Sequence, residues 1–273
     1  MIYKKIQLDK NNNSYLEVYA ADKIGSFTRN AILVIPGGGY SAVCAEREGE
    51  PIAMAFIPHG YNAFVLHYSV NKAPFPTQLI EASKAIKHIR DNAQEYNIDP
   101  YKLFTVGFSA GAHLAASLGT MWDKKEIYNE IDMPFGYNKP TGMMLIYPVI
   151  SSKYHSLSLK NLLQNPEPTD EEFANCNIEN YISENSSPAF ILHTSNDEIV
   201  DVRSSLLLAD TLADKKIKFE MHIYPDAPHG AALGNKITEC NNPKWCNPAI
   251  AKWVENAVYW ANNVSDNNSD TVL

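Results

Sequence analysis

One segment decides the fold of this chain: residues 104–114, which read FTVGFSAGAHL. Its first half is apolar and partly β-branched, which predicts a short buried strand, and its Ala- and Leu-rich second half predicts a helix. Between them lies Gly-x-Ser-x-Gly, which is typical of a sharp strand-to-helix turn with strained backbone angles at the serine. Glycines at 107 and 111 remove the side chains that would collide there. The pattern therefore predicts an exposed Ser109 hydroxyl beside a helix N-terminus.

The rest of the chain alternates between strand and helix patterns. Continuous apolar runs predict buried strands at 31–35, 62–68, 104–108, 142–148, 189–193 and 218–224, after an antiparallel hairpin of 1–9 and 15–21. Amphipathic spacing predicts helices at 46–58, 76–96, 201–212 and 247–262. This order predicts an α/β fold with a mostly parallel eight-stranded sheet, an antiparallel start and helices on both faces. We expect one domain over 1–262, with 151–187 as a short lid-like insertion and 263–273 as a disordered tail.

The composition excludes several classes of function. The chain has 273 residues, 45% hydrophobic and 20% charged, as in globular proteins with a sizeable core. A net charge of −8 disfavours nucleic acid as a partner. The absence of a signal-peptide pattern and of a long apolar run predicts a cytoplasmic protein with no membrane partner. The cysteines lack zinc-ligand spacing, so we expect reduced thiols and no metal site at Cys44, Cys176, Cys240 and Cys246.

A serine hydroxyl becomes a nucleophile only when a base takes its proton, and a carboxylate must orient that base. Ligands of such sheets bind beyond the carboxyl ends of the strands, which selects the loops there. His229 follows the last strand and is the predicted base, whereas the elbow aims Ser109 away from His113 on its own helix. Asp197, at the apex of the preceding loop, is the predicted acid. Its rival Asp226 lies too close to His229 in sequence to reach the far ring nitrogen.

The transition state also needs backbone donors for the developing oxyanion. The Ala110 N–H stands at the helix N-terminus, where the helix dipole favours negative charge. Further donors are expected from residues 36–40, PGGGY, which follow a buried strand. The alternatives are a flexible turn or a phosphate-binding loop, but this segment lacks the spacing and the lysine of a P-loop. We therefore predict an oxyanion loop.

Together these motifs resemble the α/β-hydrolase superfamily over nearly the whole chain. Residues 107–111 are similar to its nucleophile elbow, and Ser109, Asp197 and His229 follow its triad order. Within it, IPGGGY (35–40), GFSAGAHL (107–114) and PDAPHG (225–230) resemble a carbohydrate-esterase group of acetyl xylan esterases and feruloyl esterases.

This resemblance implies that Gly37 and Gly38 join Ala110 in the oxyanion hole. Hormone-sensitive-lipase relatives carry His-Gly-Gly-Gly, and Pro36 replaces that histidine here. Because the histidine supports the loop and does not react, the resemblance implies intact chemistry in a different subgroup.

The expected function is hydrolysis of a short acyl ester, an acetyl group on a carbohydrate, through an acyl-enzyme and without a cofactor. The alternatives are an arylformamidase-like amidase with the same triad, or a non-catalytic hydrolase-fold binding protein. The substrate is expected to be a small-molecule ester, and the oligomeric state is left open, with a homodimer as one option. Five residues near the predicted mouth are candidates for substrate contact, although the aromatic ones could equally be core: Gly39, Tyr40, Tyr68, Phe75 and Tyr147.

Overall fold

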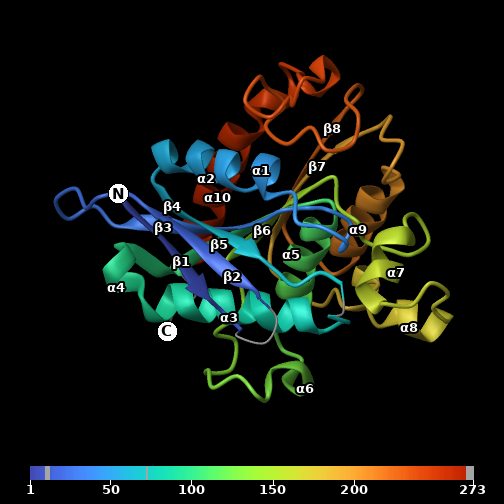
Figure 1. The fold of residues 1–273 in the computed structure, drawn as a ribbon, viewed down its shortest axis with the longest axis horizontal. Coiled ribbons are helices and arrows are strands. Elements are labelled where there is room, and N and C mark those ends of the chain that lie inside the picture. The colour runs from blue at the N-terminus through green and yellow to red at the C-terminus, as the bar shows by residue number, and fades with distance from the viewer. Residues whose placement is uncertain (10–12, 72, 269–273) are drawn as a thin grey trace.

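The computed structural model describes residues 1–9, 13–71 and 73–268. In this part of the chain eight strands form one sheet in the order β1-β2-β4-β3-β5-β6-β7-β8 (Figure 1). The pairs β1-β2 and β2-β4 are antiparallel and all the other pairs are parallel, so the predicted fold class is confirmed. The strands are β1 (Ile2–Gln7), β2 (Tyr15–Ala20), β3 (Arg29–Ile35), β4 (Tyr61–His67), β5 (Ile98–Phe108), β6 (Gly142–Ile146), β7 (Ala189–Thr194) and β8 (Phe219–Tyr224).

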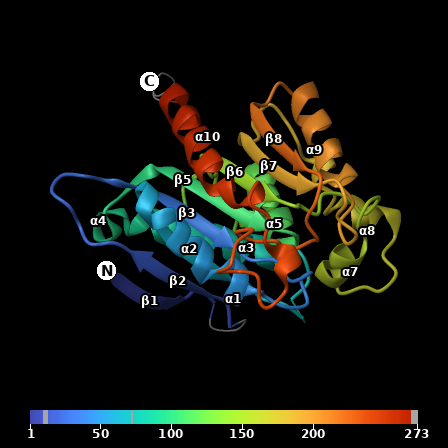
Figure 2. The ribbon, with the colours of Figure 1, turned by 90° about the horizontal axis from the view of Figure 1, so that it is seen from above.

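Helices cover both faces of the sheet (Figure 2). One face carries α1 (Ala45–Glu48), α2 (Glu50–Phe56) and α10 (Trp253–Asn268), and the other carries α3 (Thr77–Asp91), α5 (Ala110–Met121) and α9 (Arg203–Asp214). Shorter helices lie in the connections: α4 (Ala93–Tyr96), α6 (Lys125–Tyr128), α7 (Leu157–Leu163), α8 (Asp170–Ala174), and the 3-10 turns η1 (Ile57–His59), η2 (Ile178–Asn180), η3 (Pro243–Trp245) and η4 (Ile250–Lys252).

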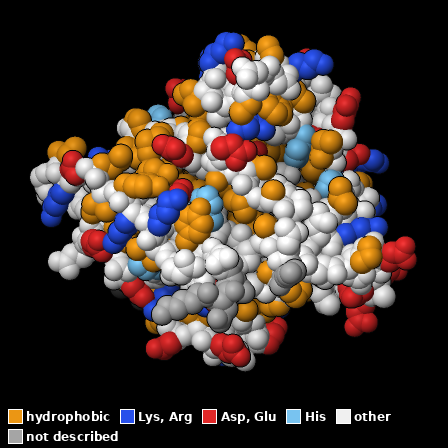
Figure 3. Space-filling model, in the orientation of Figure 1, with side chains coloured by type: hydrophobic (Ala, Val, Ile, Leu, Met, Phe, Trp, Pro, Cys, Tyr) orange, Lys and Arg blue, Asp and Glu red, His pale blue; other side chains and the backbone are white. Residues whose placement is uncertain are grey.

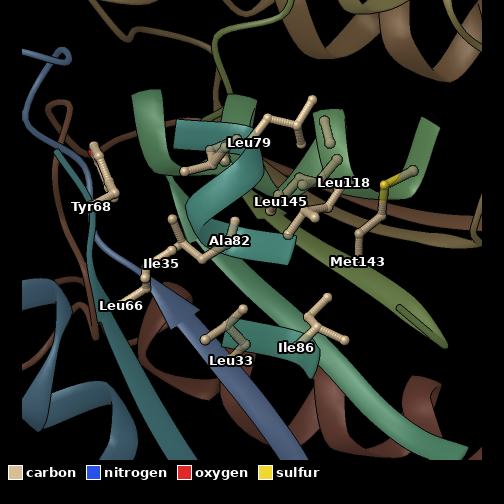
Figure 4. Packing of buried hydrophobic residues seen from close by; sticks show 14 of the residues in the cluster. Leu33, Ile35, Leu66, Tyr68, Leu79, Ala82, Ile86, Leu118, Met143 and Leu145 are labelled. Atoms are coloured by element: carbon tan, nitrogen blue, oxygen red, sulfur yellow. The ribbon is translucent and has the colours of Figure 1, made fainter. Parts of the chain in front are cut away.

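The apolar core lies in two layers, one on each side of the sheet. Side chains of a strand alternate between its two faces, so an unbroken apolar run feeds both layers. In β3, Leu33 and Ile35 face α3 and α5, where Ile35 lies beside Ala82 and Leu33 beside Ile86 (Figure 4), while Ile32 and Val34 face the layer of α2 and α10. This double burial is why residues 31–35 of β3 and all of β6 carry no polar side chain.

The C-terminal helix begins and ends six residues later than the predicted range of 247–262. α10 continues to Asn268, and Val264 is buried in the second apolar layer with 8% of its surface exposed. The prediction of a disordered tail is therefore wrong for residues 263–268, because the apolar spacing that anchors the helix continues past Ala261. Residues 269–273, and the turn at 10–12 of the predicted hairpin, lie outside the described residues.

The insertion between β6 and β7 lies beside the glycine-rich loop. It contains α7, α8 and η2, and the Asn161 side chain of α7 donates a hydrogen bond to the Gly39 carbonyl at 2.9 Å. The Phe75 N–H in turn donates to the Leu162 carbonyl at 3.1 Å. Residues 151–187 therefore contact the loop that we expected to hold the oxyanion.

The surface is of mixed charge. Lys and Arg side chains are interspersed with Asp and Glu side chains over the face shown in Figure 3. Within the residues that the structure describes, no helix combines the length and apolar character needed to cross a bilayer.

Candidate active site

The turn between β5 and α5 has the strained geometry expected of a nucleophile elbow. Ser109 adopts φ 53° and ψ −117°, a conformation that L side chains rarely hold. A Cβ at Gly107 would lie 2.3 Å from the Gly111 carbonyl oxygen, and one at Gly111 would lie 2.1 Å from the Ile35 oxygen. Both glycines are therefore required by backbone contacts, as predicted.

Three side chains from separate loops form a continuous hydrogen-bond chain. Ser109 Oγ lies 2.8 Å from His229 Nε2, and His229 Nδ1 lies 2.7 Å from Asp197 Oδ2. The other carboxylate oxygen, Oδ1, accepts the N–H groups of Ile199 and Val200, both at 2.9 Å. The three residues singled out from the sequence lie after β5, β7 and β8, and the fold brings them together at the carboxyl edge of the sheet.

The environment of Asp197 keeps its carboxylate ionised. Burial alone would raise the pKa of this carboxyl, but hydrogen bonds from His193 and His229 outweigh it and hold the pKa below the ordinary value. A carboxylate fixed in this way favours the His229 tautomer whose Nδ1 carries the proton. His229 Nε2 is then free to accept the proton of Ser109.

A second histidine lies at Asp197, and the sequence analysis did not single it out. His193 Nε2 lies 2.9 Å from the Val200 carbonyl oxygen and 3.3 Å from Asp197 Oδ2. Because a carbonyl can only accept, Nε2 carries the proton, and Nδ1 accepts from the Ser205 hydroxyl at 2.7 Å. The sequence shows that His193 precedes Asp197 by four residues, but it does not show the turn that brings the two side chains together.

His113, the histidine nearest to the nucleophile in sequence, has a structural role. It is fully buried, and its Nε2 donates to the Cys176 carbonyl at 2.7 Å while its Nδ1 accepts from the Tyr40 hydroxyl at 2.8 Å. Burial lowers the pKa of this imidazole to about 4, so it is neutral near pH 7. The prediction that it is not the base holds, although its partners are distant in sequence.

The glycine-rich loop differs from the prediction at its first glycine. The Gly37 N–H donates to the buried carboxyl of Glu48, at 2.8 Å from Oε2. That N–H is therefore occupied, and the expectation that Gly37 is an oxyanion donor is wrong. The loop nevertheless lies against the nucleophile, because a Cβ at Gly37 would stand 3.2 Å from the Ser109 Cβ.

The peptide between Gly37 and Gly38 is oriented by the hydrogen bond that its carbonyl group accepts. The Gly37 C=O accepts the Cys44 N–H at 3.0 Å, so the Gly38 N–H on the other side of the same peptide plane points away from Cys44. Within the described ranges, no acceptor is found for the N–H of Gly38 or of Ala110. The Ala110 N–H, at the start of α5, and the Gly38 N–H, in the glycine-rich loop, are therefore the candidate oxyanion donors.

The predicted substrate-contacting tyrosines are core residues. Tyr40, Tyr68 and Tyr147 expose 1%, 3% and 3% of their surface, and each hydroxyl has a protein partner. The core alternative therefore holds for these three side chains. Phe75 is half-buried, and Gly39 contacts α7 through its carbonyl.

Helix α1 supplies two contacts that the sequence did not indicate. Glu48 accepts a hydrogen bond from the Tyr147 hydroxyl at 2.8 Å, and the Tyr147 ring meets the His229 ring edge-on with centroids 4.8 Å apart. The Arg47 guanidinium stacks on Trp245 at 3.6 Å, and the Trp245 indole N–H donates to the His229 carbonyl at 3.0 Å. Residues 45–50, AEREGE, had the composition of a solvated helix face and gave no such signal.

Comparison with known protein families supports the same assignment. Residues 16–212 match the BD-FAE family model, and residues 175–258 match the dienelactone hydrolase family. A solved structure described as an acetyl ester-xyloside bifunctional hydrolase from Caldicellulosiruptor lactoaceticus is 31% identical and covers 96% of each chain, with a TM-score of 0.82.

Two curated bacterial proteins are also similar. Endo-1,4-beta-xylanase B of Butyrivibrio fibrisolvens is 40% identical over 76% of this chain, and an acetylxylan esterase of Xylanibacter ruminicola is 27% identical over 75% of it. The matched regions span only 33% and 41% of these longer relatives. The predicted fold and family are confirmed. The chain belongs to the BD-FAE family and is an α/β hydrolase of the carbohydrate-esterase-like group.

Proposed function

We propose that this protein removes short acyl groups, above all acetyl, from carbohydrate esters through an acyl-enzyme on Ser109. The observation that carries the proposal is the hydrogen-bond chain from Asp197 through His229 to Ser109, with distances of 2.7 and 2.8 Å. The names of the relatives, an acetylxylan esterase and an acetyl ester-xyloside hydrolase, support a sugar ester as the substrate class.

The mechanism follows from the positions of the three groups. His229 Nε2 takes the Ser109 proton as the serine oxygen attacks the ester carbonyl, and the imidazolium formed is stabilised by Asp197. The same nitrogen then protonates the departing sugar hydroxyl, which leaves the acyl group on Ser109. Water, activated by His229, attacks the acyl-enzyme, and the proton returns to Ser109 as the acid departs.

The oxyanion of each tetrahedral intermediate is placed on the N–H groups of Gly38 and Ala110. The Ala110 N–H also benefits from its position at the start of α5, where the helix dipole favours negative charge. Removing one such donor typically lowers turnover by roughly 10²–10³. The insertion 151–187 would act as a short lid that leaves room for a short acyl group.

The test is turnover of p-nitrophenyl acetate and of acetylated xylo-oligosaccharides by the wild type and by Ser109→Ala. We expect activity on both substrates in the wild type and a loss of at least about 10³-fold in the variant. Equal rates in the two proteins would refute the mechanism. Preferential turnover of N-formyl-kynurenine would favour an amidase, and no covalent labelling by a fluorophosphonate would favour a binding protein.

A further inference from the structure

The peptide between Pro36 and Gly37 is held from both sides. Its carbonyl accepts the Tyr68 hydroxyl at 2.9 Å, and its N–H donates to Glu48 Oε2 at 2.8 Å. Pro36 carries no side-chain donor or acceptor, so the orientation of this part of the loop depends on those two partners. The same peptide begins the loop that abuts Ser109.

The second carboxyl oxygen of Glu48, Oε1, accepts a hydrogen bond from Tyr147, which follows β6. Tyr147 accepts the Ala232 N–H at 3.1 Å, so its own proton is directed to Glu48 Oε1, 2.8 Å away. Ala232 belongs to the loop of His229, and the Tyr147 ring touches the His229 ring. Tyr147 thus contacts the loop of the base at two points.

The backbone of Tyr147 shows that this position is constrained. Its φ is 40°, a left-handed conformation that is unfavourable for a bulky aromatic residue. Such a conformation persists only where the surroundings impose it, and it occurs preferentially at functional sites. Glu48 is equally unusual, since only 4% of it is exposed and a buried carboxyl is costly unless it is hydrogen-bonded.

We propose that Glu48 is a positioning residue which, through Tyr147, keeps the oxyanion loop and the His229 loop in register. One carboxyl group joins the Gly37 N–H to a tyrosine that contacts the base, so a displacement of either loop is transmitted to the other. This role rests on the proposed ester hydrolysis at Ser109. It assigns to a short charged helix, α1, a part in shaping the transition-state site.

The first test compares kcat and KM for p-nitrophenyl acetate in Glu48→Ala, Glu48→Gln and the matched control Glu46→Ala. Glu46 is an exposed acid on the same helix, so its variant should match the wild type. Glu48→Ala should lower kcat by about 10- to 100-fold with KM within about twofold, because the transition state loses more than the ground state. Glu48→Gln keeps an oxygen for the Gly37 N–H but cannot accept the Tyr147 hydroxyl proton with its NH₂ group, so its kcat should lie between those of Glu48→Ala and the wild type. A purely structural role would leave the kcat of the folded fraction unchanged.

The second test uses near-isosteric variants, in case Glu48→Ala does not fold. Tyr147→Phe removes only the hydroxyl and keeps the ring on His229. Tyr147→Phe and Glu48→Gln should each lower kcat, and the double variant should lose about as much as the worse single variant, because all three break one bridge. Wild-type kcat in both single variants, or fully additive losses, would overturn the inference.

The two proposals can fail separately. If Ser109→Ala is as active as the wild type, the ester hydrolase mechanism is wrong. If Ser109→Ala is inactive while the Glu48 and Tyr147 variants keep wild-type kcat, only the positioning role is wrong.

Discussion

His193 and His229 approach the same carboxylate oxygen, Oδ2 of Asp197, at 3.3 and 2.7 Å. One ring is fully buried at the end of β7, and the other faces the nucleophile. The acid therefore has a donor on the side away from the reaction as well as on the side of the base. Four predictions follow from this and three other features.

Replacing His193 should impair catalysis although it contacts neither the base nor the nucleophile. Without its Nε2–H, Asp197 loses one of the donors that fix its orientation toward His229. We expect His193→Phe to lower kcat/KM by about 10-fold, with His193→Gln, which keeps a donor, closer to the wild type. The measurement is the pH profile of kcat/KM for p-nitrophenyl acetate. An unchanged profile in His193→Phe would show that this ring only fills space.

Asp197 should contribute stability that depends on pH. Because the pKa of its carboxyl is lower in the folded protein than its ordinary value near 4, its contribution is complete above that value and is lost as pH falls through the folded pKa. Asp197→Asn should therefore be less stable than the wild type at pH 7, by on the order of 2 kcal/mol, and the gap should narrow at pH 3. Urea unfolding at both pH values measures the gap, and a constant gap would contradict the argument.

Gly107→Ala should be far more damaging than the same change at Gly25. The new Cβ at 107 would lie 2.3 Å from a backbone oxygen, whereas at Gly25, which has φ 55°, it would meet no atom within 4 Å. We expect a loss of about 3 kcal/mol or more at Gly107, and about 1 kcal/mol at Gly25 from backbone strain alone. Thermal unfolding of both variants measures the two losses of stability. Similar losses would mean that backbone strain, and not collision of the new Cβ, determines the cost of each substitution.

His113 should make the protein less stable in mild acid. Its folded pKa of about 4 lies below the ordinary value of 6.5, so between these values only the unfolded chain takes up the proton. Stability should fall by about 3 kcal/mol from this group as pH drops from 6.5 to 4. His113→Gln, which cannot ionise, should lower stability at pH 7 but flatten this dependence. Parallel pH dependences in the two proteins would contradict the prediction.

The three residues of the hydrogen-bond chain could be selected from the sequence because each is marked by features that are local in sequence. Ser109 is marked by a glycine pattern, and His229 and Asp197 follow apolar strands whose carboxyl ends must meet at one edge. Glu48 could not be found in this way. Its burial depends on how α1 packs against two loops that are distant in sequence, and its neighbours are charged.

The error at Gly37 has the same origin. The glycine triplet showed which backbone was unhindered, but the direction of each N–H depends on the partner of that peptide, here Glu48. The end of α10 was missed for a related reason. Polar composition after Asn262 suggested a frayed tail, whereas α10 runs on to Asn268 and Val264 is buried in the apolar layer.

The contacts between the insertion and the loop limit how this scaffold can be re-engineered. Asn161 binds the Gly39 carbonyl, and the Cys176 carbonyl receives His113, which in turn holds Tyr40. A chimera that exchanges residues 151–187 for the corresponding segment of a relative would therefore alter the support of the glycine loop along with the proposed lid. Grafts that keep Asn161 and the backbone at Cys176 should transfer a new alcohol preference, and grafts that lose them should be poor catalysts for any ester.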